Sequence, residues 1–336
     1  MIRPSPKPSR RWIPRLPAES IPRRRLPAEL GHWQDMTLCI GAISRRDLAI
    51  VTISDLMLSA PDETMSAETG GMKLTPIGTE GLWLSLYAGD SSIPARIHAR
   101  VEKALINQPQ DLVRIEAAFR DAFKAELKRK IEDEMLGPSG LTRGEFMRKG
   151  REYFGDEEFV RLYYHMNKIE LDTEFLVGGF DIQPTGTIPR LFSLSDPGVT
   201  AYRDAQSYCA IGIGSTLANA TLTTLPFDPF DSLQNIIYRL CEAKFRGESA
   251  LGVGKMTFVV VLYPDGKTAA IFPERTEQIR SLWGAKGKPP VPPEAAQLIP
   301  TLFMPIGWGK DFADQAKEAQ ASASIQALAD KLKEAD

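Results

Sequence analysis

Apolar residues in this chain fall into short runs rich in β-branched side chains, separated by longer stretches with helical spacing. Residues 37–43 (TLCIGAI) and 48–54 (LAIVTIS) are two such runs, and the polar residues 44–47 join them. This pattern predicts a β-hairpin. Residues 72–77 and 81–88 repeat it across a short link that contains glycine, so we expect a second pair of strands there.

Helical spacing dominates the next part of the chain. Four apolar residues recur at every fourth position and predict a helix over 94–106: Ile93, Ile97, Val101 and Leu105. Residues 110–168 are strongly charged, have a helical period and are broken near 137–140. This helical insertion is either a docking lobe or lid, or a helical hairpin with a solvated outer face.

A second group of strands follows the insertion. Residues 174–183 and 189–195 predict a strand pair, and 208–213 predicts a strand that leads into a helix near Ser215. The nearly continuous apolar run at 257–263 is typical of a central strand covered on both faces. The order of elements predicts an α+β fold of four layers, αββα, in which two sheets pack together and helices cover their outer faces.

Both ends of the chain differ from this pattern. Residues 1–36 contain seven prolines and a net charge of +5, so we expect a disordered basic leader that is either not translated, with Met36 as the true start, or removed. Residues 286–336 predict a proline-rich linker and then a polar C-terminal helical extension over 310–335. The main domain is therefore predicted to span 37–285.

Composition excludes several classes of function. The chain has 336 residues, 43% of them hydrophobic and 25% charged, with a net charge of −2, as in ordinary globular proteins. Its three cysteines, Cys39, Cys209 and Cys241, and its three histidines lie far apart in sequence, so we expect no disulfide framework, no metal site and no cofactor. No apolar run is long enough to span a membrane, and a cytoplasmic location is predicted.

The most informative segment is MTLCIGAISRRDLAIVTISD followed by GGMKLTPIGTEGLWLSLYAGDSS. It resembles the opening of proteasome β-subunit-like N-terminal nucleophile (Ntn) hydrolases and their bacterial relatives. In that family a mature chain begins with threonine, an aspartate follows the second strand, a lysine opens the third strand and a glycine follows the fourth. The resemblance assigns these catalytic roles to Thr37, Asp55, Lys73 and Gly89, and a substrate-binding hydroxyl to Ser59.

The resemblance resumes at LVGGFD (176–181), FSLSDPG (192–198) and AIGIGSTLA (210–218), and covers about 37–270. It implies an Ntn-hydrolase sandwich and assembly into a homo-oligomer, and it leaves open an ATPase partner. Its pattern is incomplete at two places. The family has a serine in the turn where this chain has Ile213, so Ser215 is the candidate substitute, and only Glu248 or Ser249 lies near the place of a further acid.

The chemistry implied by these residues is sound in itself. A threonine hydroxyl needs a base, and the α-amino group of an N-terminal threonine, with an ordinary pKa of about 7.7–8.0, is one. A lysine nearby would lower that pKa and stabilise the alkoxide, an aspartate would hold the lysine, and a glycine N–H could bind the oxyanion. The family usually cleaves its precursor after a glycine, whereas Met36 precedes Thr37 here, so removal of an initiator methionine is the expected route to a free Thr37.

Three functions follow from the sequence. The first is a threonine protease or amidohydrolase that cleaves peptide or small amide bonds. The second is a non-catalytic proteasome-like scaffold or interaction protein that keeps the fold without the chemistry. The third, a nucleic-acid binder, rests on the basic leader alone and is the least favoured.

Overall fold

A computed structural model describes the main part of the chain. The leader 1–36 and the predicted helical extension 310–335 lie outside the described residues, so the expectations about them stay predictions. All described residues belong to one unit, 34–336. The described ranges are 37–56, 58–59, 66–67, 73–89, 91–225, 227–250, 252–286 and 291–306.

The first sheet contains the predicted hairpin. Strand β1 (Cys39–Ser44) pairs antiparallel with β2 (Ala49–Asp55), and the register runs from Cys39 opposite Ser54 to Ser44 opposite Ala49. The described strands of this sheet follow the order β10-β1-β2-β11-β12-β13. Strand β11 (Thr257–Leu262) lies between β2 and β12, and all six of its residues are buried, which confirms its prediction as a central strand. The other bounds are β10 (Tyr208–Ile211), β12 (Thr268–Ile271) and β13 (Met304–Ile306).

The second sheet is also antiparallel, with its described strands in the order β5-β6-β7-β8-β9. It contains the two predicted strand pairs, and β9 is a further edge strand that the apolar pattern did not predict because its residues are partly or fully exposed. The bounds are β5 (Leu74–Ile77), β6 (Trp83–Ala88), β7 (Glu174–Gln183), β8 (Gly186–Ser195) and β9 (Val199–Tyr202).

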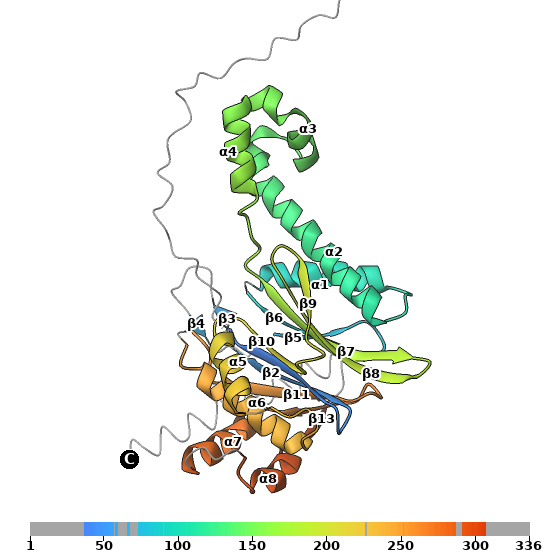
Figure 1. Cartoon of the computed structure of the whole chain (residues 1–336), viewed down its shortest axis with the longest axis vertical. Coiled ribbons are helices and arrows are strands. Elements are labelled where there is room, and N and C mark those ends of the chain that lie inside the picture. Colours follow the sequence, from blue (N-terminus) through green and yellow to red (C-terminus); the bar gives the residue numbers. More distant parts are fainter. Residues whose placement is uncertain are drawn as a thin grey trace, which may run out of the picture. The chain divides into compact units, whose positions relative to one another are not determined.

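Helices cover the outer faces of the two sheets, as the four-layer prediction required (Figure 1). Helices α1 (Ser92–Leu105) and α2 (Leu112–Ile131) share one apolar core with the second sheet, and the inner face of the first sheet contributes to the same core. The opposite face of the first sheet packs against four other described helices in a second core. These helices are α5 (Ser215–Thr224), α6 (Leu233–Gly247), α7 (Pro273–Ala285) and α8 (Ala295–Leu302).

The two sheets approach closely where glycines face leucine and isoleucine side chains. A Cβ on Gly41 would lie 3.0 Å from a methyl carbon of Leu176, and a Cβ on Gly178 would lie 3.0 Å from Ile50. A larger residue at either position would have to displace its neighbour. The two sheets are therefore in close contact at this point.

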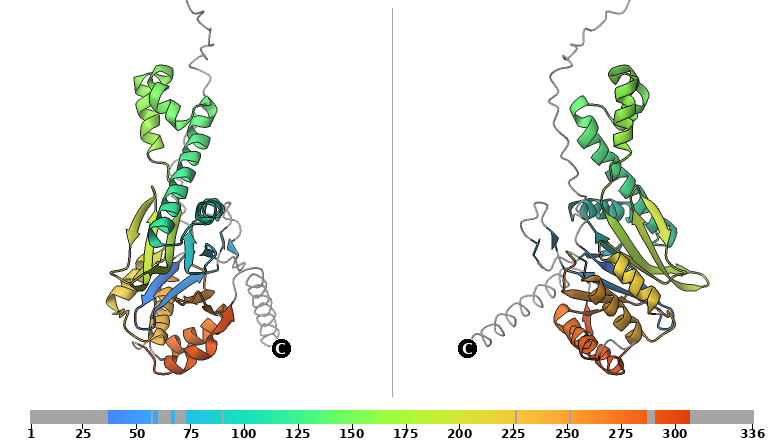
Figure 2. Two further views of the ribbon diagram at one scale, coloured as in Figure 1. Left: turned by 90° about the vertical axis from the view of Figure 1, so that its right-hand side faces the viewer. Right: turned by 60° about the vertical axis from the view of Figure 1, so that its left-hand side comes forward.

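The insertion over 110–168 is helical, as predicted. Helix α2 continues through a π-helical turn (Glu132–Leu136) and a 3-10 turn (Gly137–Ser139) to α3 (Arg143–Phe154) and α4 (Asp156–Met166). Helices α3 and α4 lie beyond the far end of α2, away from the sheets (Figure 2). They pack on each other through Phe146 and Phe159, whose rings are stacked with centroids 4.8 Å apart.

The segment after α7 contains more regular structure than a proline-rich linker. Helix α8 buries Ala295, Ile299 and Leu302 completely or almost so, although Pro300 lies inside it. Strand β13 then joins the edge of the first sheet by pairing with β12. No helix among the described residues is long and apolar enough to span a membrane. The extent of the main domain, 37–285 in the sequence analysis, stays a prediction.

Candidate active site

Three of the predicted catalytic residues lie in contact. The Lys73 ammonium donates one hydrogen bond to the Thr37 hydroxyl oxygen Oγ1 and another, of 2.7 Å, to Asp55 Oδ1. All three residues are buried, with exposed fractions of 2% or less. Thr37 stands just before β1, Asp55 ends β2 and Lys73 stands just before β5. The cluster therefore joins strand ends of the two sheets.

Backbone N–H groups hold the second oxygen of Asp55. Leu38 N–H donates to Oδ2 at 3.1 Å, and Gly254 N–H donates to the same oxygen at 3.3 Å. Burial raises the pKa of the Asp55 carboxyl, whereas the ammonium groups of Lys73 and Lys244 and the bonded N–H groups counteract that rise. With both oxygens in hydrogen bonds, the carboxylate has a defined orientation toward Lys73.

The local structure explains how these residues meet. The hairpin register places Cys39 opposite Ser54, so Leu38 comes next to Asp55, and the backbone N–H of Asp55 donates to Leu38 O at 3.3 Å. Lys73 is anchored on the second sheet, where its carbonyl oxygen accepts from Tyr87 N–H at 3.1 Å. The long Lys73 side chain then reaches the first sheet.

Gly89 follows β6 and has a left-handed φ of +126°. A Cβ at this position would lie 2.8 Å from both Asp172 O and Thr173 Oγ1, so only glycine fits without displacement of its neighbours. Gly89 lines the pocket described below. This is the position that the sequence analysis expected for the oxyanion donor, and that role stays a prediction.

The turn that leads into α5 packs directly on Thr37. Gly212 has a φ of +86°, and a Cβ there would lie 2.3 Å from the Thr37 carbonyl oxygen. Gly212 N–H donates to Glu174 Oε2 at 2.8 Å, which joins the turn to the second sheet. Ser215 begins α5 and lines the pocket beside Ile213. No bond from the Ser215 side chain to Thr37 or Lys73 is found among the described residues.

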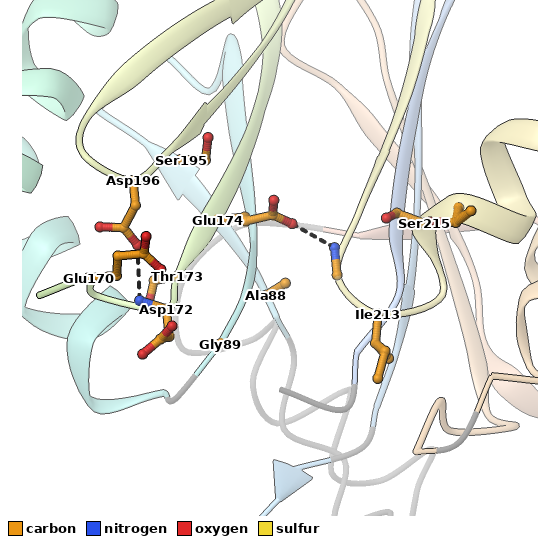
Figure 3. Close-up of a pocket in the computed structure, with 12 residues that line it drawn as sticks. Ala88, Gly89, Glu170, Asp172, Thr173, Glu174, Ser195, Asp196, Ile213 and Ser215 are labelled. Atoms are coloured by element: carbon orange, nitrogen blue, oxygen red, sulfur yellow. Dashed lines mark hydrogen bonds between the residues drawn. The ribbon is translucent and has the colours of Figure 1, made fainter. Parts of the chain in front are cut away.

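A pocket of about 400 Å³ borders this turn (Figure 3). Ala88 and Gly89 line it together with four carboxylates: Glu170, Asp172, Glu174 and Asp196. The described lining residues include no lysine or arginine. Asp196 accepts hydrogen bonds from the backbone N–H groups of Leu171 and Asp172, so its carboxyl holds the segment just before β7 in place. Burial raises the pKa of the Asp196 carboxyl, and the backbone N–H groups that bond it counteract that rise.

The other predicted residues lie apart from this cluster. Ser59 belongs to β3 (Leu58–Ser59), which pairs with β4 (Ser66–Ala67), and its side chain lies outside the described parts. Glu248 accepts from Lys244 Nζ at 2.7 Å and from Arg280, and it makes no described contact with Thr37. Ser249 donates to a carbonyl oxygen of its own helix end. No described group of three or more histidine, cysteine, aspartate or glutamate residues could hold a metal ion.

Sequence reasoning missed two residues that support the cluster, Lys244 and Gly254. Lys244 had a recognisable signal, because it falls on the buried stripe of α6 at the helical spacing of Leu233, Ile237 and Leu240. A lysine on such a stripe is unusual, since lysine is almost never fully buried without a partner. Gly254 had no signal of its own, because its contact with Asp55 depends on tertiary structure.

Two antiparallel sheets packed between layers of helices define an α+β sandwich of four layers, αββα. Solved structures with a similar fold include Anbu, described as an ancestral β-subunit, from Yersinia bercovieri: 15% identity, 74% of this chain and 94% of that chain covered, TM-score 0.53. An Anbu mutant from Hyphomicrobium sp. strain MC1 is also similar: 16% identity, the same coverage, TM-score 0.51.

No family model matches the chain, and no curated protein matches it. At 15–16% identity the likeness to the Anbu structures shows the fold alone. The sequence analysis assigned the chain to the proteasome β-subunit-like Ntn hydrolase family, and that assignment is wrong as stated. The comparisons show the fold of the chain and no family membership. The segment-by-segment resemblance identified the sandwich of two sheets, and the two Anbu structures share this fold with the chain at low identity.

Proposed function

We propose that this chain is a threonine-nucleophile hydrolase of peptide or small amide bonds, with Thr37 as the nucleophile. The observation that carries the proposal is the Lys73 ammonium, which bonds both the Thr37 hydroxyl oxygen and the Asp55 carboxylate in a buried setting. An ammonium at this place favours the negative charge that develops on the oxygen as it attacks. Because it donates to that oxygen, it cannot also accept the hydroxyl proton, and the base must be another group.

The base in this proposal is the α-amino group of Thr37. With an ordinary pKa of about 7.7–8.0, and with Lys73 beside it to disfavour its protonation, the amine is neutral often enough to act near pH 7. It takes the hydroxyl proton as the oxygen bonds to the amide carbon. The same proton then passes to the leaving nitrogen as the carbon–nitrogen bond breaks. Water hydrolyses the resulting ester and restores Thr37.

The remaining predicted residues have roles near this centre. The N–H of Gly89 is the proposed oxyanion donor, and removal of such a donor elsewhere lowers kcat by roughly 10²–10³-fold. The pocket beside Gly212 is the proposed site for the part of the substrate next to the scissile bond. Ser215 lines that pocket, so its hydroxyl is proposed to contact substrate. Since the Yersinia protein is described as a subunit, we also propose that this chain assembles with copies of itself.

The chemistry requires a free amine, because the nitrogen of a threonine inside a chain is an amide and not a base. Intact mass of the natively expressed protein should therefore correspond to a chain that begins at Thr37. A β-lactone or vinyl sulfone probe should add its mass to the peptide that contains Thr37. The variant Thr37→Ala should lose the label, whereas Thr185→Ala, in the exposed turn before β8, should keep it. A mature chain that retains residues 1–36 and stays unlabelled would refute the proposal.

The second candidate is a scaffold or interaction protein without hydrolytic activity. Ile213 favours it, because an isoleucine stands where the predicted pattern requires a hydroxyl, and Ser215 makes no described bond to the cluster. The labelling experiment separates the two candidates. A protein that begins at Thr37, is folded and still resists every probe would support the scaffold.

A further inference from the structure

Lys244 is a fully buried charged side chain near the candidate site. It lies in the last turn of α6, and its side chain is 0% exposed. Its ammonium donates to Glu248 Oε1 at 2.7 Å and to the carbonyl oxygen of Gly254 at 2.6 Å. Burial lowers the pKa of Lys244, and the negative charges of Glu248 and Asp55 act in the opposite direction. A methionine of similar length would fill the space without this desolvation cost.

The two backbone groups of Gly254 connect Lys244 with Asp55. Its carbonyl oxygen accepts from Lys244, while its N–H donates to Asp55 Oδ2. Arg280 holds the next carbonyl, that of Lys255, at 2.7 Å. The loop between α6 and β11 is thus held at two successive carbonyls by two cations. Its orientation determines whether Asp55 Oδ2 keeps the bond from Gly254 N–H beside the one from Leu38 N–H.

Packing at the end of α6 reaches the proposed nucleophile from another side. A Cβ on Gly247 would lie 2.4 Å from a methyl carbon of Leu38, the residue that follows Thr37. Leu38 also donates to Asp55 Oδ2. Helix α6 therefore borders the residue next to Thr37 and, through Gly254, the carboxylate that orients Lys73.

The charges form an alternating series. Arg280 pairs with Glu248 at 2.7 Å, Glu248 pairs with Lys244, and Asp55 pairs with Lys73. The groups that face Asp55 are the ammonium groups of Lys73 and Lys244, and beyond them lies the Cys39 thiol, whose pKa is raised by burial. The Lys244 charge favours the ionised form of Asp55. The same positive charge disfavours a proton on an amine at Thr37.

We propose that Lys244 is a positioning residue for Thr37: it holds Gly254 so that Asp55 stays directed at Lys73, and its charge supports the ionised carboxylate. This inference rests on the proposed function. Without Lys244 the Gly254 carbonyl loses its donor, so Gly254 N–H is held less firmly on Asp55 Oδ2 and Leu38 N–H becomes the main bond that keeps the carboxylate directed at Lys73. A misplacement of about 1 Å at a reacting group costs roughly 10²-fold in rate.

The test measures the rate constant for β-lactone labelling of Thr37, per labelled site, from pH 5 to pH 9 in the natively expressed protein. The variants are Lys244→Met, which removes the charge, and Lys244→Arg, which keeps it. Lys267→Met, at an exposed lysine in the turn after β11, is the matched control. Thermal unfolding of each variant is recorded in parallel.

We expect Lys244→Met to be labelled roughly 10²-fold more slowly. The acidic limb of its pH profile should also move to higher pH, because the Asp55 carboxyl and the proposed Thr37 amine bind a proton more readily without the Lys244 charge. Lys244→Arg should restore the profile, and Lys267→Met should match the wild type. A merely structural role would lower the melting temperature and the labelled fraction, and it would leave the profile of the labelled sites unchanged. That result would overturn the inference.

A second variant covers the case in which Lys244→Met does not fold. Glu248→Gln keeps an oxygen that can accept from Lys244 and Arg280, and it removes a negative charge. The acidic limb should then move to lower pH, and an unchanged limb would overturn the inference. If the wild type is labelled and Lys244→Met has the same rate and pH profile, the role of Lys244 is refuted while the proposed function is not. A wild type that is never labelled refutes the proposed function, and the inference with it.

Discussion

Lys73→Met tests the buried ion pair that joins the two sheets. The Lys73 and Asp55 side chains are 3% and 0% exposed, and Nζ lies 2.7 Å from Oδ1. The substitution leaves the Asp55 carboxylate buried and removes the cation in direct contact with it. Loss of one partner of a buried pair costs about 3–5 kcal/mol, because the remaining charge stays desolvated. We therefore expect the free energy of unfolding to fall by about this amount, out of the roughly 5–15 kcal/mol of an ordinary domain.

A second substitution in the same protein isolates the cause. Asp55→Asn keeps an oxygen that can accept from the N–H groups of Leu38 and Gly254, and its amide carries no charge. The double variant Asp55→Asn/Lys73→Met should therefore be about 2 kcal/mol more stable than Lys73→Met alone. The assay is urea unfolding followed by tryptophan fluorescence at one fixed protein concentration. If the costs of the two single variants simply add in the double variant, the pair is not coupled and the reasoning is wrong.

Two further substitutions test a buried histidine of the core and the Gly212 turn that packs on Thr37. Burial lowers the pKa of His98 to about 4 from an ordinary 6.5, so the folded state favours neutral imidazole. The full contribution of His98 to the free energy of unfolding should be present above pH 6.5. That free energy should fall by roughly 3 kcal/mol as the pH drops to 4. His98→Gln should remove this pH dependence in urea titrations, and the exposed His165→Gln should keep it. Gly212→Ala should lower stability by more than the roughly 1–2 kcal/mol of left-handed strain, because its Cβ also meets Thr37 O. Gly140→Ala, with a φ of +66° and nothing within 4 Å of its Cβ, measures the strain alone; equal losses would contradict the contact argument.

Local patterns in the sequence were enough to predict most strands and the layer order. Runs such as 37–43 and 257–263 carry β-branched residues at the density of buried strands, and each became a strand of the first sheet. Helix α8 was missed because Pro300 usually ends a helix, whereas here the burial of Ile299 and Leu302 overrides that preference. Burial against other elements is a tertiary effect, and no local pattern reports it.

The candidate site was predictable in part for the same reason. The resemblance gave the spacing of Thr37, Asp55 and Lys73, and their side chains are in contact. The partners that orient them come from distant parts of the chain. Glu174 bonds the Gly212 turn across 38 residues, a pairing that depends on how the two sheets pack. Single-sequence reasoning has no access to such contacts.

The bond from Gly254 to Asp55 also has a consequence for synthesis. Its two residues are separated by 199 positions, so they emerge from the ribosome far apart in time. Thr37, Asp55 and Lys73 are made early, while the loop that completes the carboxylate's environment is made after all the described strands of the second sheet but only half of those of the first. On the proposed function, a growing chain therefore holds an incomplete site until the loop before β11 is made, and hydrolysis is delayed until that point of synthesis.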